Sequence, residues 1–150
     1  MKLWHHWFRF AIAGCLAMPL GAAAAGAEGT NPLVAERWKT RPIVVVVPHA
    51  DHPLLRRVEA TLAETAGREA FRDREMVLYT VVAGQGRRDG RLLAAPRTAA
   101  LLRAIDVEAG GAPAFVLVGK DGGVKMREGA DVDLQSVFEE IDRMPMRRKR

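Results

Sequence analysis

The chain has 150 residues, of which 49% are hydrophobic by type, and a formal net charge of +5. This length predicts one domain. Four of the positive residues are the terminal "RRKR", and residues 28–146 sum to about −1. The charge therefore does not support a basic nucleic-acid-binding face spread over the fold.

Residues 1–27 have the order of a secretory signal peptide. Lys2 and Arg9 come first, an apolar stretch follows, and small residues end the segment at Ala23–Ala27. The apolar stretch, Phe10–Leu20, is shorter than the roughly 20 residues that a membrane-spanning helix needs. We therefore expect export to a bacterial periplasm and cleavage of the signal peptide.

Cys15 is the only cysteine of the chain. The sequence "IAGC" before it has the pattern that precedes the lipid-modified cysteine of bacterial lipoproteins. Arg9, however, leaves too few apolar residues before Cys15, and the apolar run continues past it, so cleavage near Ala27 is the preferred interpretation. The mature chain would then have no cysteine, which excludes disulfides and thiol–disulfide exchange.

The elements begin after a short polar lead-in at residues 28–37, and one folded domain is expected over residues 38–143. Ile43–Val47 is a β-branched run without polar alternation, which predicts a strand buried on both faces. Asp51 is expected to cap the next helix, which starts at Pro53 and ends at about Ala66, with Gly67 closing it.

Met76–Val82 is the second predicted strand, and a flexible solvated loop rich in glycine and arginine is expected from Gly84 to Gly90. Pro96 then starts a helix, and Phe115–Val118 is a third apolar strand. The first three strands are separated by helices and are expected to be parallel neighbours.

The last part of the chain predicts a hairpin and a helix. Gly119–Gly123, "GKDGG", has the glycines of a tight turn. Val124–Arg127 is expected to return as an edge strand, followed by a helix that Asp133 caps and that ends at Arg143. Residues 144–150 form a basic tail.

The element order β-α-β-α-β-β-α, with a central mixed sheet flanked by helices, is an α/β architecture of the thioredoxin-like kind. Thioredoxin-like proteins enter the equivalent of the third strand through a cis-proline. Pro113 stands at that place in "GGAPAFVLV" and is expected to be cis on the strength of this likeness.

Several segments resemble an uncharacterised family of small exported bacterial domains of unknown function. They include "RWKTRPIVVVV", "RDREMVLYTVV", the motif Gly119-Lys120-Asp121-Gly122-Gly123, and Met144-Pro145-Met146-Arg147. That family is similar to the DUDES domains of extracellular-matrix and sushi-repeat proteins. The resemblance covers Leu33–Arg150 and implies a thioredoxin-like fold without redox cysteines. It brings no established substrate and no catalytic residues to carry over.

His49, Asp51 and His52 occupy the place where thioredoxins carry their reactive Cys-x-x-Cys. Imidazole and carboxylate groups suit zinc, copper or nickel, so one interpretation is a metal site. A closed site needs about four ligands, however, and the other two histidines, His5 and His6, lie in the signal segment. The preferred interpretation is a solvated turn in which Asp51 caps the helix.

The other charged motifs favour structural roles. Gly84–Gly90 lacks the direct entry into a helix that a phosphate-binding loop needs. Lys120 and Asp121 are expected to belong to a hairpin turn rather than to a catalytic pair. Arg72–Arg74 is expected to form an ion pair in a turn. The tail Arg147, Arg148, Lys149 and Arg150 is expected to be solvated, with weak contact to anionic lipid or an acidic partner as the alternative.

The sequence thus predicts a non-catalytic binding or adaptor domain of the periplasm, with an unknown protein or envelope component as its partner. No cofactor and no nucleic acid are expected. The alternative hypothesis is a metal-binding protein or enzyme that uses His49, Asp51 and His52.

Overall fold

The computed structural model describes residues 29–145. The 3₁₀ helix η1 (Pro32–Glu36) leads into strand β1 (Arg41–Val47), helices α2 (Pro53–Ala63) and α3 (Thr65–Asp73), and strand β2 (Met76–Val82). The strands β3 (Gln85–Arg88) and β4 (Arg91–Leu92) and helix α4 (Ala95–Ala104) follow. Strands β5 (Ala114–Val118) and β6 (Val124–Glu128) and helix α5 (Leu134–Arg143) complete the fold.

The six strands form one mixed sheet in the order β4-β3-β2-β1-β5-β6. Strand β1 is parallel to β2, and every other pair is antiparallel. The mixed α/β class is confirmed. The expectation that the third buried strand runs parallel to its neighbours is wrong, because β5 pairs antiparallel with β1. A buried apolar strand has the same composition in either direction, so its sequence could not decide this.

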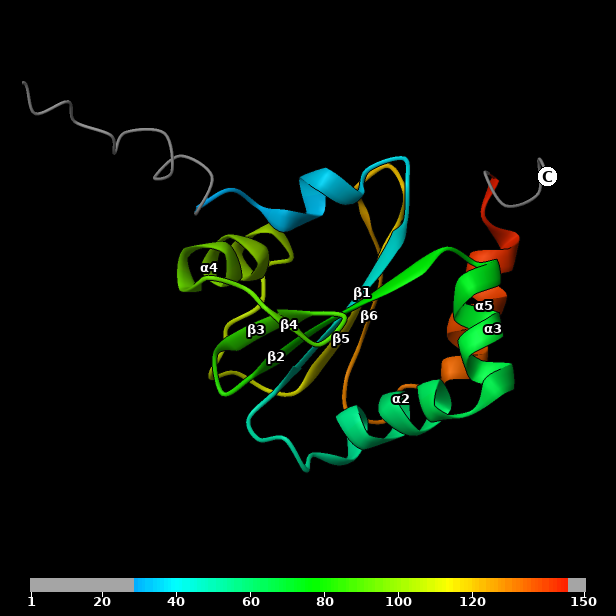
Figure 1. Cartoon of the computed structure of the whole chain (residues 1–150), viewed down its shortest axis with the longest axis horizontal. Helices are drawn as coiled ribbons and strands as arrows, with labels where there is room; N and C mark the ends of the chain where they lie inside the picture. The colour runs from blue at the N-terminus through cyan, green and yellow to red at the C-terminus, as the bar shows by residue number, and fades with distance from the viewer. Residues whose placement is uncertain (1–28, 146–150) are drawn as a thin grey trace, which may run out of the picture.

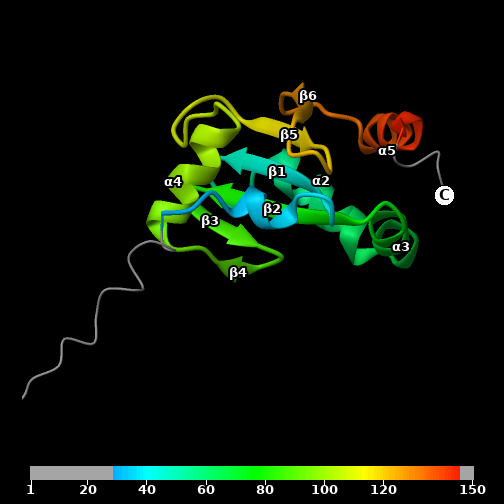
Figure 2. The same ribbon diagram turned by 90° about the horizontal axis from the view of Figure 1, so that it is seen from above.

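Helices cover both faces of the sheet (Figure 1). Helices α2, α3 and α5 share one apolar core with Ile43, Val45 and Val47 of β1. Helix α4 and η1 pack with Val44 and Val46 on the opposite face of the sheet. Figure 2 shows the same arrangement from above. All seven residues of β1 are buried, and the prediction of a central strand buried on both faces is confirmed for the β-branched run Ile43–Val47. No helix within residues 29–145 is long and apolar enough to cross a membrane.

The predicted helix after β1 is two helices that meet at Glu64. Gly67 does not close the first helix but lies buried inside α3. A Cβ on Gly67 would lie 1.8 Å from the carbonyl oxygen of Thr61, so only glycine lets the two helices meet this closely. Helix α3 then packs on α5, where the Phe71 and Phe138 rings meet edge to face at 5.8 Å.

We expect Gly67→Ala to lower the free energy of unfolding by about 2 kcal/mol, because the added methyl group forces the α2–α3 elbow apart. Urea denaturation measures the change. Gly110→Ala is the matched control, since a Cβ there meets nothing within 4 Å, and it should change stability by less than about 0.5 kcal/mol. Equal losses in the two variants would contradict the packing role of Gly67.

The segment expected to be a glycine- and arginine-rich loop is instead the β3–β4 hairpin, which extends the sheet beyond β2. Two-residue turns bound β3 on either side. Ala83 and Gly84 have φ angles of 48° and 80°, and Asp89 and Gly90 have φ angles of 45° and 79°. Such left-handed pairs fit the twist of neighbouring antiparallel strands, which is why the segment forms strands.

The end of the chain agrees with its predictions. Gly122 has a φ of 85° in the turn between β5 and β6, as expected for a tight hairpin turn. Asp133 caps α5, with its carboxylate accepting from the N–H groups of Gln135 and Ser136. The region expected to be a polar lead-in contributes η1, which buries Leu33 and Glu36 against the sheet. Residues 1–28, with Cys15 and the predicted cleavage site, and residues 146–150 lie outside the described residues.

Candidate functional site

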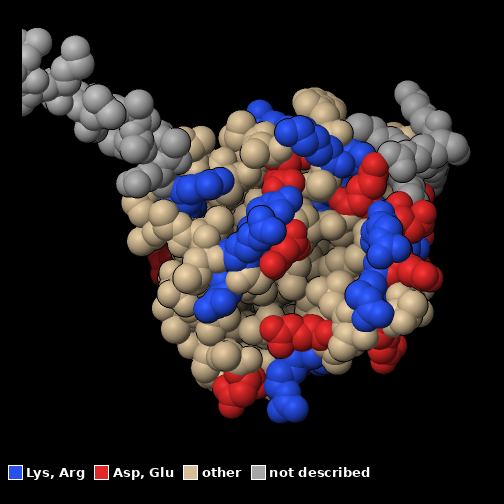
Figure 3. All heavy atoms as spheres, in the orientation of Figure 1, with Lys and Arg blue, Asp and Glu red and all other residues tan. Residues whose placement is uncertain are grey.

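A groove of about 730 Å³ lies between strand β2 and helix α2, and we call it the β2–α2 groove. Its floor is formed by Leu78, Thr80 and Val82, the half-buried residues of β2. Figure 3 shows a hollow in the middle of this face, bordered by both basic and acidic side chains. The remaining lining residues are Ala50, Leu55, Glu59, Ala83, Gln85, Arg87 and Gly90. Its volume is in the range of ligand-binding sites.

The groove exists because the sheet is wider than its helical cover. Helix α2 packs its buried residues on β1 and β5, and the β3–β4 hairpin extends the sheet on the far side of β2. Residues of β3 alternate between the two faces. Gly86 lies against Thr98 of α4, and Arg88 reaches Glu36 of η1, so Gln85 and Arg87 face the groove.

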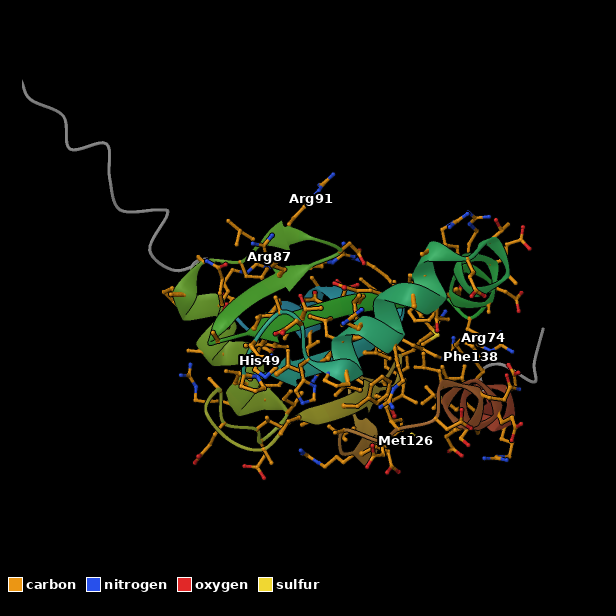
Figure 4. All side chains as sticks on the ribbon, turned by 90° about the horizontal axis from the view of Figure 1, so that it is seen from below. His49, Arg74, Arg87, Arg91, Met126 and Phe138 are labelled. Atoms are coloured by element: carbon orange, nitrogen blue, oxygen red, sulfur yellow. The ribbon has the colours of Figure 1, made fainter. Side chains whose placement is uncertain are left out.

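Arg87 and Glu59 are the two ionisable residues of the groove lining. Arg87 donates two long hydrogen bonds of 3.4 Å, to the carbonyl of Gly90 and to the side chain of Gln85. Neither Arg87 nor Glu59 has an ion-pair partner within residues 29–145. In Figure 4, Arg87 lies over the sheet, whereas Arg91 extends past the sheet edge into solvent. The groove thus combines an apolar floor with a cation and an anion that a ligand can pair with.

The β2–α2 groove adjoins the carboxyl ends of the two parallel strands, β1 at Val47 and β2 at Val82. Crevices at the carboxyl ends of parallel strands are where α/β sheets commonly bind ligands. Two smaller hollows of about 280 Å³ each also open beside the Ala83–Gly84 turn. One of them reaches Pro48, which is the last residue before the His49 turn.

The His49–His52 turn stands at this end of the sheet, but Asp51 does not cap the helix. His52 is the N-cap residue, and its Nδ1 accepts from the N–H of Leu54 at 3.3 Å. Asp51 pairs instead with His49, at 2.5 Å between Oδ1 and Nδ1. The hydrogen bond from His49 lowers the pKa of the Asp51 carboxyl. His52 takes the N-cap position because it directly precedes Pro53, the first helical residue, whereas Asp51 lies one residue further away.

His49, Asp51 and His52 lie together at the start of α2, and the structure uses one ring nitrogen of each histidine locally. The two Nδ1 atoms are engaged by Asp51 and by Leu54, and the imidazole rings are tilted by 55° at 5.4 Å between centroids. The Asp51 side chain is 84% exposed. No group of three or more histidine, cysteine, aspartate or glutamate side chains within residues 29–145 is arranged to hold a metal ion.

Pro113 is not a cis-proline, because residues 29–145 contain no cis peptide bond. The trans form is the lower in energy for an X-Pro bond by about 0.5–1 kcal/mol. Strand β5 begins at the next residue, Ala114, and pairs regularly with β1 from there. The entry into β5 therefore needs no unusual isomer.

The Gly119–Gly123 motif forms the turn between β5 and β6, as predicted, and the structure explains its lysine. Lys120 forms an ion pair with Glu75, which also pairs with the buried Arg41 at 3.5 Å. Asp121 pairs with Lys125 at 2.6 Å, and this contact lowers the pKa of Asp121. The motif thus ties the β5–β6 turn to the start of β1 and the α3–β2 turn.

Arg74 confirms the expected ion pair in the Arg72–Arg74 segment, although its partner lies on another helix. Its guanidinium is 2.6 Å from Asp142 of α5 and lies over the Phe138 ring, 4.8 Å from the centroid. Figure 4 shows Arg74 and Phe138 side by side. This contact fastens α3 to α5.

Glu36 is the centre of a buried polar cluster that no sequence motif indicated. The residue is buried, with 6% of its surface exposed. It accepts from the hydroxyl of Tyr79 at 2.8 Å, from Nε of Arg88 at 2.7 Å and from the hydroxyl of Thr40 at 2.6 Å. The partners are up to 52 residues away in the sequence. The cluster joins η1, β2 and β3 on the face opposite to the β2–α2 groove.

The Glu36 cluster makes stability depend on pH. Burial raises the pKa of Glu36, but hydrogen bonds from Arg88, Thr40 and Tyr79 outweigh burial, and the pKa lies below its ordinary value of 4.5. Stability from this carboxylate is thus present above pH 4.5 and is lost as the pH falls through the folded-state pKa. We expect the stability difference between the wild type and Glu36→Gln to shrink from pH 7 to pH 3, as measured by urea denaturation. A constant difference would contradict an ionised Glu36.

Taken together, these features define a mixed α/β domain with a partly charged groove at the carboxyl ends of its parallel strands. The family described as "Domain of unknown function (DUF4174)" matches residues 32–150, and the chain belongs to this family. The predicted membership in an uncharacterised family is therefore confirmed. No curated protein and no solved structure matches the chain.

Proposed function

We propose that the chain is a thioredoxin-like, non-catalytic binding domain that holds a segment of another protein in the β2–α2 groove. The thioredoxin-like assignment is supported by a parallel β1–β2 pair joined by helices and by the antiparallel β5–β6 hairpin beside β1. The β3–β4 hairpin is then an addition to that fold. The Gly119–Gly123 motif supports a distant relationship to the DUDES domains.

The groove is the observation on which this proposal depends. It stands beside the turn that carries the reactive cysteines in thioredoxins, and here that turn is His49-Ala50-Asp51-His52. A dithiol exchange reaction needs two cysteines, and the whole chain has one. A protein segment that lies in this groove would thus be bound rather than reduced.

The lining indicates what such a segment carries. The floor of Leu78 and Val82 suits an apolar side chain, and the hydroxyl of Thr80 between them can hydrogen-bond to a peptide group. Arg87 can donate two hydrogen bonds to one carboxylate of a ligand. Glu59, across the groove, can form an ion pair with an amino group or a basic side chain. The proposed ligand is a short peptide segment with apolar residues and at least one acidic residue.

Selection from a library of random peptides tests this proposal. Peptides that bind the wild-type domain should be enriched in one acidic residue beside apolar residues, and they should not bind Thr80→Lys, whose ammonium group fills the floor of the groove. Val124→Lys, on the distant edge strand β6, is the matched control and should retain the peptides. Selected peptides that bind Thr80→Lys as well as the wild type would overturn the proposal.

We also propose that the domain works in the periplasm after removal of residues 1–27. The support is the order of charged, apolar and small residues in that segment. Mass spectrometry of the protein isolated from its natural source should find an N-terminus near Glu28. An intact chain, or one that begins at a lipid-modified Cys15, would contradict it.

A further inference from the structure

The turn before β1 presents an exposed tryptophan in a conformation that L-amino acids rarely adopt. Trp38 is 68% exposed and has a φ of 64°. The left-handed region disfavours side chains with a Cβ, and an exposed aromatic ring gains nothing from burial in the fold. The position thus carries a costly residue that belongs to neither of the two apolar cores of the described residues.

The backbone around Trp38 is nevertheless held firmly. The N–H of Trp38 donates to the carbonyl of Lys120 at 2.7 Å, and the N–H groups of Lys39 and Thr40 donate to the carbonyl of Glu36 at 3.0 Å. The Arg37 side chain lies directly on Gly122, where a Cβ would be 2.6 Å from its Nε. The ring is therefore presented to solvent by a fixed turn rather than by a loose end.

The charge around Trp38 is positive. Arg37 and Lys39 flank it and are exposed, and neither forms an ion pair within residues 29–145. The nearby carboxylates are already paired, Glu75 with Arg41 and Lys120 and Asp121 with Lys125.

The C-terminal end of α5 lies at the same end of the molecule as the turn that carries Trp38. Asp142 of α5 pairs with Arg74, whose carbonyl accepts a hydrogen bond from Arg41 at the start of β1. Figure 1 shows the end of α5 and the start of β1 at the same end of the sheet. In the sequence, the basic residues Arg147–Arg150 follow α5 after three residues, and they lie outside the described residues.

We infer that this end of the domain, centred on Arg37, Trp38 and Lys39, binds the surface of an anionic lipid bilayer. Tryptophan prefers the headgroup level of a bilayer, where its ring is amphipathic, and basic residues are attracted to anionic headgroups. A protein interface would instead place an aromatic anchor in the middle of an apolar patch. Here charged residues flank the ring on both sides, which favours a lipid surface.

Trp38 can report its own contact with lipid. The chain has three tryptophans, and Trp4→Phe with Trp7→Phe leaves Trp38 as the only one. In this full-length background, we expect vesicles of phosphatidylglycerol to shift the tryptophan emission to shorter wavelength. Vesicles of phosphatidylcholine should not, and added salt should reverse the shift.

Two variants make the result decisive. Arg37→Glu with Lys39→Glu should weaken vesicle binding by about fivefold for each basic residue lost, with circular dichroism to show that the variant folds. Moving the reporter, by Trp38→Phe with Leu92→Trp, places the tryptophan at a 61% exposed position on β4, where no shift is expected. This control removes any contribution from the apolar N-terminal segment, which is the same in both proteins.

An equal shift at positions 38 and 92, or an equal shift with the two lipids, would overturn the inference. So would a Trp38 emission that vesicles leave unchanged but that an acidic protein fraction shifts, since the surface would then bind protein. The outcome is independent of the β2–α2 groove, which lies at the opposite ends of β1 and β2.

Discussion

Arg87→Glu is expected to weaken the binding of a peptide selected on the wild-type domain by at least tenfold. The substitution removes a charge-assisted hydrogen bond, which contributes about 1.5–3 kcal/mol, and places a second carboxylate across the groove from Glu59. Each 1.4 kcal/mol is a factor of ten in the dissociation constant. Isothermal titration calorimetry with one selected peptide measures the change.

Arg91→Glu is the matched control for this experiment. Arg91 is an exposed arginine on the neighbouring strand β4, and its side chain points away from the sheet (Figure 4). The charge of the whole protein changes equally in the two variants, so a general electrostatic effect would weaken both. Equal losses would show that the acidic peptide is attracted by overall charge and not held at Arg87.

Glu36→Ala should lower the free energy of unfolding by about 3 kcal/mol. The substitution removes charge-assisted hydrogen bonds from Arg88 and leaves the buried hydroxyl of Tyr79 without its acceptor, and each of these losses costs about 1–3 kcal/mol. Urea denaturation at pH 7 measures the change. Because Tyr79 is 1% exposed, water cannot readily replace the lost carboxylate.

Glu59→Ala provides the comparison, since Glu59 is an exposed glutamate on α2. It should change stability by no more than about 0.5 kcal/mol. Tyr79→Phe should recover part of the stability lost in Glu36→Ala, because the double variant no longer buries an unsatisfied hydroxyl. If Glu36→Ala were as stable as Glu59→Ala, the cluster would not anchor η1 to the sheet.

The sequence was most informative where burial and local geometry coincide. The β-branched run of β1 is buried throughout, and Asp133 caps α5, because both signals act within a few residues. It was least informative for the β3–β4 hairpin. The pairs Ala83-Gly84 and Asp89-Gly90 enclose a segment of strand length, and Asp-Gly is a known hairpin signal. The segment between them is polar and rich in arginine, however, so it lacks the apolar pattern that predicts a strand.

The candidate site could not be predicted because it depends on packing rather than on a motif. Thr80 and Arg87 face the β2–α2 groove only because α2 stops short of the extended edge of the sheet. Similarly, Glu36 meets Tyr79 and Arg88 only after η1 folds back on the sheet. The predicted residues His49 and His52 lie next to the groove, yet their side chains are used by the local turn and the helix cap.

The most direct test of the proposed binding function is a nuclear magnetic resonance titration of the domain with a selected acidic peptide. The amide signals of Leu78, Thr80, Val82, Gln85 and Arg87 should shift most, because these residues form the floor and one wall of the β2–α2 groove. Largest shifts on α4 or on the β6 edge, with those five signals unchanged, would contradict the assignment of the groove as the binding site.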